Sequence, residues 1–172
     1  MGMDIHTYIV DENGKIKYTD LYEGRNYEWF ADLTEKTEHN KSYANWSPNY
    51  GLSKNFDPNT DLRYIEDEID EDVRDWCFDF RHIKVGDFIE WYEESKPYID
   101  AGWCTKYEAW LYHNKGIIPD YLAKELGEYD IVADREFIEV NNPYDPATVI
   151  YNFMMEHEDI NVNDYFNFFF DN

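Results

Sequence analysis

The chain has 172 residues, of which 38 are Asp or Glu and 15 are Lys or Arg, so its formal net charge at pH 7 is −23. Aromatic residues make up 19% of it, far too much for a disordered acidic tail, so a packed core must hold these charges together. The same charge disfavours nucleic acid and anionic membranes as direct ligands, because both bind clustered Lys and Arg.

A chain of 172 residues suits one domain, with roughly two thirds of the unfolded surface buried. We expect an α+β fold in a single domain over residues 1–172. An N-terminal hairpin and further short strands would form a mostly antiparallel sheet packed by several short helices. The sequence shows no signal-peptide pattern and no run near the roughly 18 apolar residues of a membrane span, so we expect a cytoplasmic protein.

Alternating residues predict a β-hairpin in the first twenty residues. Asp4 to Ile9 alternate as in a half-buried strand, Asn13-Gly14 is a hairpin turn, and Lys15 to Tyr18 resume the alternation. The spacing of apolar residues over Asn26 to Lys36 then predicts a short helix, and a polar stretch over residues 37–59 predicts a long irregular loop.

The middle of the chain predicts an acidic helix over Asp61 to Phe80. Apolar residues recur there at three- and four-residue spacing while acids fill the other face. These apolar residues are Leu62, Ile65, Ile69, Val73 and Trp76. Residues 81–85 predict a short strand, and Asp87 is typical of the N-cap of a helix that runs to about Glu94.

Capping signals predict the helices that follow. Thr105 and Glu108 match a capping box at the start of a helix that ends before Gly116. Pro119 at a first-turn position predicts a further short helix over Asp120 to Leu126, and Asp145-Pro146 predicts one that runs to about His157.

Two more strand patterns complete the sequence. Tyr129 to Val140 alternate around Ala133-Asp134-Arg135, which predicts a second hairpin, and the aromatic run Tyr165 to Phe170 predicts a last strand. Cys77 and Cys104 lie in aromatic surroundings, which favours buried reduced thiols over a disulfide or a metal pair.

Two blocks of the sequence resemble a known protein family. Met1-Gly2-Met3-Asp4-Ile5-His6 and, further on, the segment Gly24 to Leu33 resemble small proteins found mostly in bacteriophages and prophages, which commonly begin Met-Gly-Cys-Asp-Ile-His and carry Gly-Arg-Asn-Tyr before a helix. A looser similarity continues through His82 to Phe88, and Met3 stands where the family usually has Cys. The resemblance implies a phage setting and the cytoplasm of the host cell, and it implies no particular reaction.

The first candidate site is built on Asp4 and His6. Residues two apart on a strand point to the same face, so this carboxylate and imidazole are placed to share a divalent metal or to act as an acid and base pair, with His82 or His113 completing the set. A histidine on an amphipathic strand is more often a hydrogen-bonded structural residue. The sequence shows no Ser-His-Asp signature, Walker loop or dinucleotide fingerprint, and we assign no catalytic residue and no cofactor outside this alternative.

The second candidate site lies beside the first in the sequence. Arg25, Asn26 and Tyr27 are candidate ligand-binding residues, because a guanidinium supplies a bidentate fork for a nucleotide or another small anion. The structural alternative is that Asn26 caps a helix and Arg25 pairs with a nearby acid.

The third candidate site is acidic. One run lies on the expected middle helix, where neighbouring carboxylates would be about 5 to 6 Å apart, and a second group follows the last basic residue, Arg135. The predicted partner-binding residues are Glu66, Asp67, Glu68, Asp70, Glu71, Asp72, Glu156, Glu158, Asp159 and Asp164. A calcium loop is excluded because the run lacks the required glycine, and a solvated helix face is the structural alternative.

Three functions follow from these patterns. The first is a phage-encoded acidic binding protein that inhibits a host nucleic-acid-binding or defence protein through its basic surface, as anti-CRISPR, anti-restriction and DNA-mimic proteins do. The alternative is a nucleotide- or metal-binding protein or hydrolase that acts on a small signalling nucleotide through Asp4, His6 and Arg25, with a divalent metal. The third is a phage structural or housekeeping protein whose acidity serves only solubility.

Overall fold

The structure is a computed structural model that describes residues 3–26, 29–30 and 49–171. It divides into two compact units: unit 1 comprises Met1–Ser95 and Val149–Asn172, and unit 2 comprises Lys96–Thr148. All paired strands are antiparallel and short helices pack beside them, so the predicted α+β class is confirmed. The expectation of a single domain stays a prediction.

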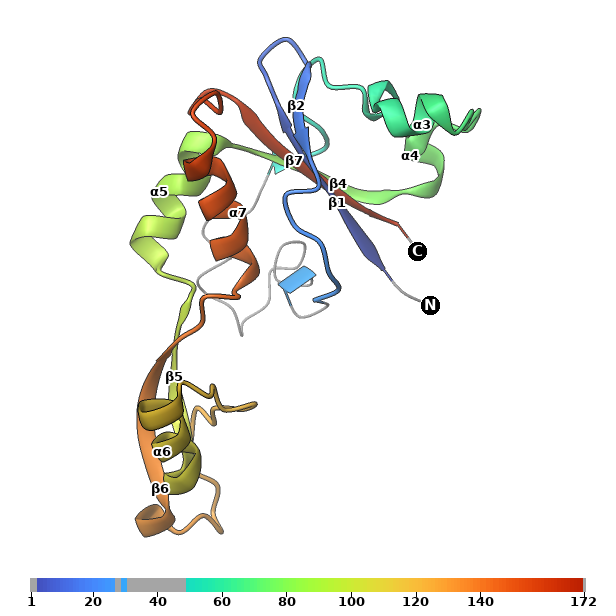
Figure 1. The fold of residues 1–172 in the computed structure, drawn as a ribbon. Coiled ribbons are helices and arrows are strands. Elements are labelled where there is room, and N and C mark those ends of the chain that lie inside the picture. The colour runs from blue at the N-terminus through green and yellow to red at the C-terminus, as the bar shows by residue number, and fades with distance from the viewer. Residues whose placement is uncertain (1–2, 27–28, 31–48, 172) are drawn as a thin grey trace. The chain divides into compact units, whose positions relative to one another are not determined.

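Unit 1 is built on a five-stranded sheet in the order β2-β1-β7-β4-β3. The strand that is last in the sequence, drawn red in Figure 1, lies between β1 and β4. The bounds are β1 Asp4–Val10, β2 Ile16–Thr19, β3 Asn49–Tyr50, β4 Phe78–Lys84 and β7 Tyr165–Asp171. The predicted N-terminal hairpin and the predicted last strand are both confirmed.

The turn between β1 and β2 depends on Gly14. The Asp11 carboxylate accepts hydrogen bonds from the amides of Asn13 and Lys15, and Gly14 has a φ of +86°. A Cβ atom on Gly14 would lie 1.9 Å from the carbonyl oxygen of Asn55. Only glycine permits both the left-handed backbone and this close approach.

Both faces of the central strand β7 are buried, which explains its many aromatic residues. Phe166, Phe168 and Phe170 point to one face and Phe169 to the other, and all four are at most 1% exposed. The buried amide of Asn167 interrupts the run, and it is satisfied because it accepts from the backbone of Ser53 at 2.8 Å and donates to the Ser53 hydroxyl at 2.9 Å.

The predicted helix over Asp61 to Phe80 is wrong. The segment forms the short helices α3 (Leu62–Glu66) and α4 (Val73–Trp76), and β4 already begins at Phe78. A 3₁₀ turn, η1 (Pro58–Thr60), precedes them. Asp61 and Asp72 each accept from a backbone amide two residues on, so each starts its own helix, and Glu68 between them has a φ of +50°.

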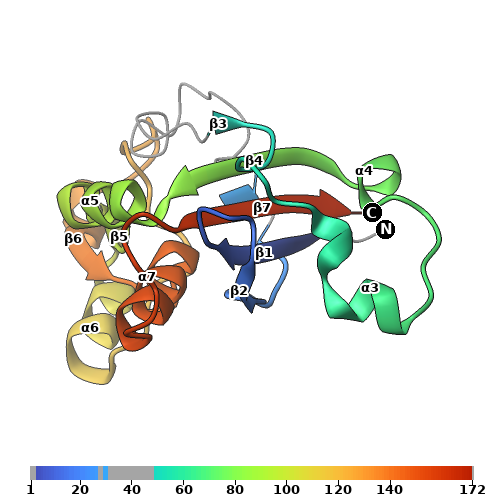
Figure 2. The ribbon, with the colours of Figure 1, turned by 90° about the horizontal axis from the view of Figure 1, so that it is seen from above.

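Other predictions in unit 1 have mixed outcomes. The helix expected to run to about Glu94 is confirmed as α5 (Val85–Ser95), but Asp87 lies in its first turn, so the prediction that it is the N-cap is wrong. The helix expected to run to Lys36 and most of the loop expected over 37–59 lie outside the described residues. α5 and the part of α7 in unit 1 lie side by side in Figures 1 and 2, and the rings of Tyr92 and Tyr151 stack with centroids 4.1 Å apart.

Unit 2 is a two-stranded sheet of β5 (Ile99–Thr105) and β6 (Arg135–Asn141) with α6 (Lys106–Lys115) packed against it. The predicted capping box is confirmed, because the Thr105 hydroxyl accepts from the amide of Glu108 and the Glu108 carboxylate accepts from the amide of Thr105. The core residues of this unit are Cys104, Ala109, Leu122, Ile138 and Val140.

Two predictions in unit 2 are wrong. Residues 120–126 form no helix; instead Ala123 exchanges both backbone hydrogen bonds with Trp103, at 2.7 and 2.9 Å. Gly102 permits this approach, since a Cβ atom there would lie 2.7 Å from the Ala123 oxygen. The hairpin expected within Tyr129 to Val140 is also absent: a 3₁₀ turn, η2 (Val132–Asp134), leads into β6, which pairs with β5.

The helix predicted from Asp145-Pro146 is confirmed as α7 (Pro146–Glu156), and the Asp145 carboxylate accepts from the amide of Ala147 at 2.9 Å. Cys77 and Cys104 are buried and free, as predicted. Among the described residues, no helix is long and apolar enough to cross a membrane.

Candidate protein-binding surface

The carboxylate of Asp4 is engaged by Arg25. Two guanidinium nitrogens of Arg25 donate to it, at 2.6 and 3.2 Å, and this pair holds the pKa of Asp4 below its usual range. Both side chains are about half exposed. Two of the predicted site residues therefore form an ion pair with each other, as the structural alternative expects.

His6 and His82 belong to different surroundings. The Nε2 atom of His6 lies 2.8 Å from the Asp171 carboxylate, and its ring stacks on Phe169. His82 is on β4, with β7 between it and β1, and its Nδ1 atom lies 2.9 Å from the carbonyl oxygen of Gly51. In the part of the chain that the structure describes, no group of three or more His, Cys, Asp or Glu is arranged to hold a metal ion.

Asn26 acts as a helix cap, since its side-chain oxygen accepts from the amide of Trp29 at 3.0 Å. Tyr27, the third predicted ligand-binding residue, lies outside the described residues.

The predicted acidic run is exposed, although it does not lie on one helix. Glu66 ends α3, and the carboxylates that follow it stand on the connection to α4. Asp72 differs from the others because it caps α4 and pairs with Arg74 at 3.0 Å. The regular carboxylate spacing expected from a continuous helix is therefore absent, and any likeness to the phosphates of a DNA strand cannot rest on it.

Three of the apolar side chains that define the helical spacing of this segment are exposed. Leu62, Ile65 and Ile69 are 68%, 59% and 40% exposed, whereas Val73, which belongs to the same spacing, is fully buried. Leu62 and Ile65 lie three residues apart on one face of α3. We call these three residues and the five exposed acids beside them the α3 surface; the acids are Glu66, Asp67, Glu68, Asp70 and Glu71.

Asp61 and Arg63, at the start of α3, tie this helix to the N-terminal hairpin. Asp61, only 3% exposed, accepts from the Tyr8 hydroxyl at 2.9 Å and from two nitrogens of Arg63, the shorter bond being 2.6 Å. Arg63 also bonds Asp20 at 2.8 Å. Burial alone would raise the pKa of Asp61, but the bonds from Arg63 and Tyr8 outweigh it and hold this pKa below its usual range.

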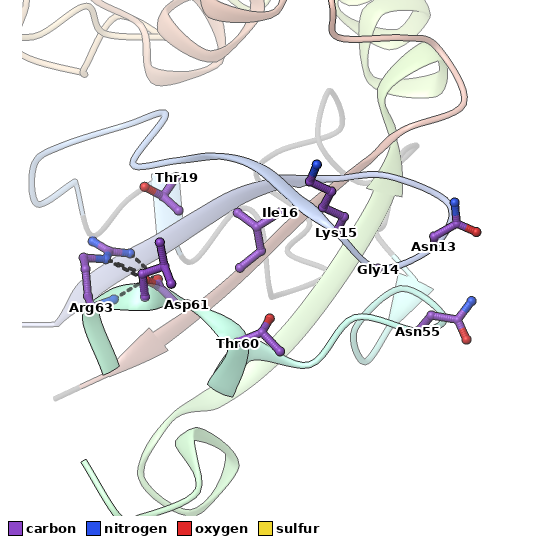
Figure 3. Close-up of a pocket in the computed structure, with 10 residues that line it drawn as sticks. Asn13, Gly14, Lys15, Ile16, Thr19, Asn55, Thr60, Asp61 and Arg63 are labelled. Atoms are coloured by element: carbon purple, nitrogen blue, oxygen red, sulfur yellow. Dashed lines mark hydrogen bonds and ion pairs between the residues drawn. The ribbon is translucent and has the colours of Figure 1, made fainter. Parts of the chain in front are cut away.

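A pocket of about 620 Å³ opens beside the α3 surface. Figure 3 shows Lys15 and Ile16 of the hairpin on one side of it and Thr60, Asp61 and Arg63 on the other. Leu62 also lines it. The Asp61 and Arg63 charges in its wall satisfy each other, and Lys15 adds a further positive charge to the lining.

No protein-family model, curated protein or solved structure matches this chain. The residues themselves therefore carry the functional argument.

The C-terminal acids are not equally accessible. Glu156, Glu158 and Asp159 are exposed, and Asp159 accepts a hydrogen bond of 2.6 Å from the Tyr18 hydroxyl. Asp164 is only 3% exposed and pairs with Lys17 at 2.8 Å. The prediction that Asp164 binds a partner at the surface is therefore wrong. Its ion pair with Lys17 links β2 to the turn before β7.

Sequence reasoning found the acids of the α3 surface and missed its apolar part. A stripe of Leu and Ile at helical spacing indicates a core face in most proteins, whereas Leu62, Ile65 and Ile69 are exposed. A signal was present in Asp61 and Asp72, since two good N-cap residues eleven positions apart divide the stripe into two helices.

Proposed function

We propose that the chain is a phage-encoded binding protein that inhibits a host nucleic-acid-binding or defence protein by docking the α3 surface on that partner's basic site. The observation that carries this proposal is the exposure of Leu62, Ile65 and Ile69 amid five accessible carboxylates. Exposed apolar side chains clustered in this way are typical of interaction sites. The phage setting comes from the resemblance of the N-terminal blocks.

The two parts of the α3 surface have different roles in binding. The carboxylates attract Lys and Arg that otherwise contact phosphates, and the net charge of −23 speeds encounter over a longer range. Leu62 and Ile65 supply desolvated contacts that slow dissociation, and the pocket beside Leu62 has room for a side chain of the partner. Charge therefore governs the association rate, and apolar contact governs residence time.

The alternative activity at Asp4, His6 and Arg25 is less favoured by the observed contacts. The Asp4 carboxylate bonds the Arg25 guanidinium, and His6 lies against Asp171 and Phe169. Contacts of this kind are those that the structural alternative expects.

The test is affinity capture from a bacterial lysate with the intact protein as bait, at low and at high ionic strength. At low salt we expect to capture a protein that binds nucleic acid through a basic surface. At high salt this protein should no longer be captured. A Leu62→Ser/Ile65→Ser bait should fail to retain it, while a Met155→Ser bait, changed at a residue that is also 55% exposed in unit 1, should retain it. Equal capture by all three baits contradicts the proposal.

A further inference from the structure

The two edges of the sheet in unit 2 differ. Trp103 on β5 exchanges its backbone hydrogen bonds with Ala123, so that edge is partly covered. These bonds also show that the N–H and C=O of Trp103 point away from β6. Phe137 is the residue opposite Trp103, so its own N–H and C=O point away from β5.

The outer edge of β6 is open. By the two-residue alternation of an antiparallel pair, Glu139 points its backbone groups the same way as Phe137. At the end of the strand, the Asn141 amide donates to the Tyr112 hydroxyl at 3.0 Å. No backbone or side-chain group of the described chain bonds the outward N–H and C=O groups of Phe137 and Glu139. They form a template for a further strand.

The charges along β6 select what kind of strand fits. Glu136 and Glu139 are exposed and form no ion pair with any described residue, while Arg135 is engaged by Asp130 at 3.1 Å. A second copy of the chain would bring a further charge of −23 to this edge and would be repelled. A strand that carries Lys or Arg opposite the two glutamates is attracted instead.

The side chains on the two faces of β6 complete the selection. On one face the ring of Phe137, 55% exposed, meets the ring of Trp103 with centroids 5.4 Å apart. On the other face Ile138 and Val140 belong to the core against α6. An added strand would extend both faces, with an aromatic residue beside Phe137 and β-branched residues beside Ile138 and Val140.

We propose that the edge of β6 binds an extended basic segment of a partner protein as an added antiparallel strand. The main-chain bonds to Phe137 and Glu139 provide affinity, and Glu136 and Glu139 select cationic side chains. This inference goes beyond the function proposed for the α3 surface, because it uses other residues and names a different kind of ligand.

The test uses the intact protein and the synthetic peptide Thr-Val-Lys-Val-Tyr-Lys-Thr, with blocked ends and a fluorescent label, followed by fluorescence anisotropy. In antiparallel register its third and fifth residues face Glu139 and Phe137. Methylation of the backbone nitrogens of those two residues removes the bonding donors and should weaken binding about tenfold or more. Methylation at the second and fourth residues leaves the donors in place and should change binding little.

Protein variants test the same edge from the other side. Glu139→Gln should weaken binding by loss of charge, and Glu139→Pro should weaken it further because it also removes the outward N–H of the edge strand. The Leu62→Ser/Ile65→Ser variant should bind the peptide unchanged, which separates this test from that of the α3 surface. Equal weakening by the two methylation patterns, or no binding at low salt, would overturn strand addition.

Discussion

The hydroxyl of Tyr8 donates a hydrogen bond of 2.9 Å to the carboxylate of Asp61, so β1 is bonded directly to the residue that caps α3. Tyr8 is fully buried, and burial raises its pKa far above the usual range, so the hydroxyl stays protonated and donates. The placement of the α3 surface on unit 1 depends on this bond and on the bond from Arg63 to Asp20.

Replacement of Tyr8 by Phe should lower the free energy of unfolding by about 1 to 2 kcal/mol, because the buried Asp61 carboxylate loses one of its donors while the ring packing is kept. Urea denaturation, monitored by tryptophan fluorescence, measures this free energy. Tyr18→Phe is the matched control, since that hydroxyl bonds the exposed Asp159, and its loss should be smaller. A loss for Tyr8→Phe no larger than that of the control would contradict the role given to the bond.

Stability at low pH should depend on Asp61. Its pKa is lowered in the folded state, so its contribution is present above the unfolded pKa of about 3.8 and is lost as the pH falls through the folded value. Asp61→Asn should therefore be less stable than the wild type at pH 7, and the difference should shrink in acid below about pH 3.8. Denaturant midpoints across this range measure the effect, and a difference independent of pH would contradict it.

Asp145 should show the opposite dependence. Burial raises its pKa to about 6, although bonds from the amides of Thr148 and Ala147 act against this. A raised folded pKa means that stability is lost as the pH rises through about 6, so Asp145→Asn should be more stable than the wild type at pH 7. The gain should be roughly 1 to 2 kcal/mol after allowance for partial exposure, and Asn should still cap α7. The gain in stability should vanish near pH 4. Thermal melts of the variant and the wild type at pH 7 and at pH 4 measure this difference.

Both cysteines should be protected in the folded protein. Burial raises the pKa of Cys77 to about 12 and also raises the pKa of Cys104, so few thiolates form at pH 8. Ellman's reagent should titrate almost no thiol in the native protein and both thiols in denaturant. Fast reaction of Cys77 under native conditions would contradict this protection.

Substitutions in the apolar part of the α3 surface should weaken binding and leave the stability of the fold almost unchanged. Leu62→Ser/Ile65→Ser removes exposed apolar contacts only, so the unfolding free energy should change by less than about 0.5 kcal/mol while the captured partner dissociates at least tenfold faster. Replacing Glu68 and Asp70 with Gln and Asn should mainly lower the association rate and its salt dependence. Stopped-flow kinetics with the purified partner distinguishes the two effects; equal changes in both rates would contradict the division of roles.

The parts of the fold that local signals determine were predictable. The capping box at Thr105 and Glu108, the Asn-Gly turn and the Asp145-Pro146 helix start each depend on contacts within a few residues. The aromatic strand β7 was also predicted. Its place at the centre of the sheet was not, because that depends on pairing with β1 and β4, which lie far from it in the sequence.

The errors have tertiary causes. Pro119 and Gly127 favour a short helix between them, but Ala123 gains two backbone bonds to Trp103 in an extended conformation, and Gly102 permits this approach. The apolar spacing from Leu62 to Trp76 fits one helix, yet separate caps divide it and leave three of its five apolar residues at the surface. That division created the apolar part of the candidate site, and periodicity alone does not reveal it.

The measurement that tests the central claim most directly is competition. The purified partner, bound to a labelled nucleic acid, is titrated with the intact protein and with Leu62→Ser/Ile65→Ser. The account predicts that the wild type releases the nucleic acid stoichiometrically, that the variant is at least tenfold weaker, and that both effects weaken as salt rises. Simultaneous binding of protein and nucleic acid to the partner would contradict occupation of its basic site.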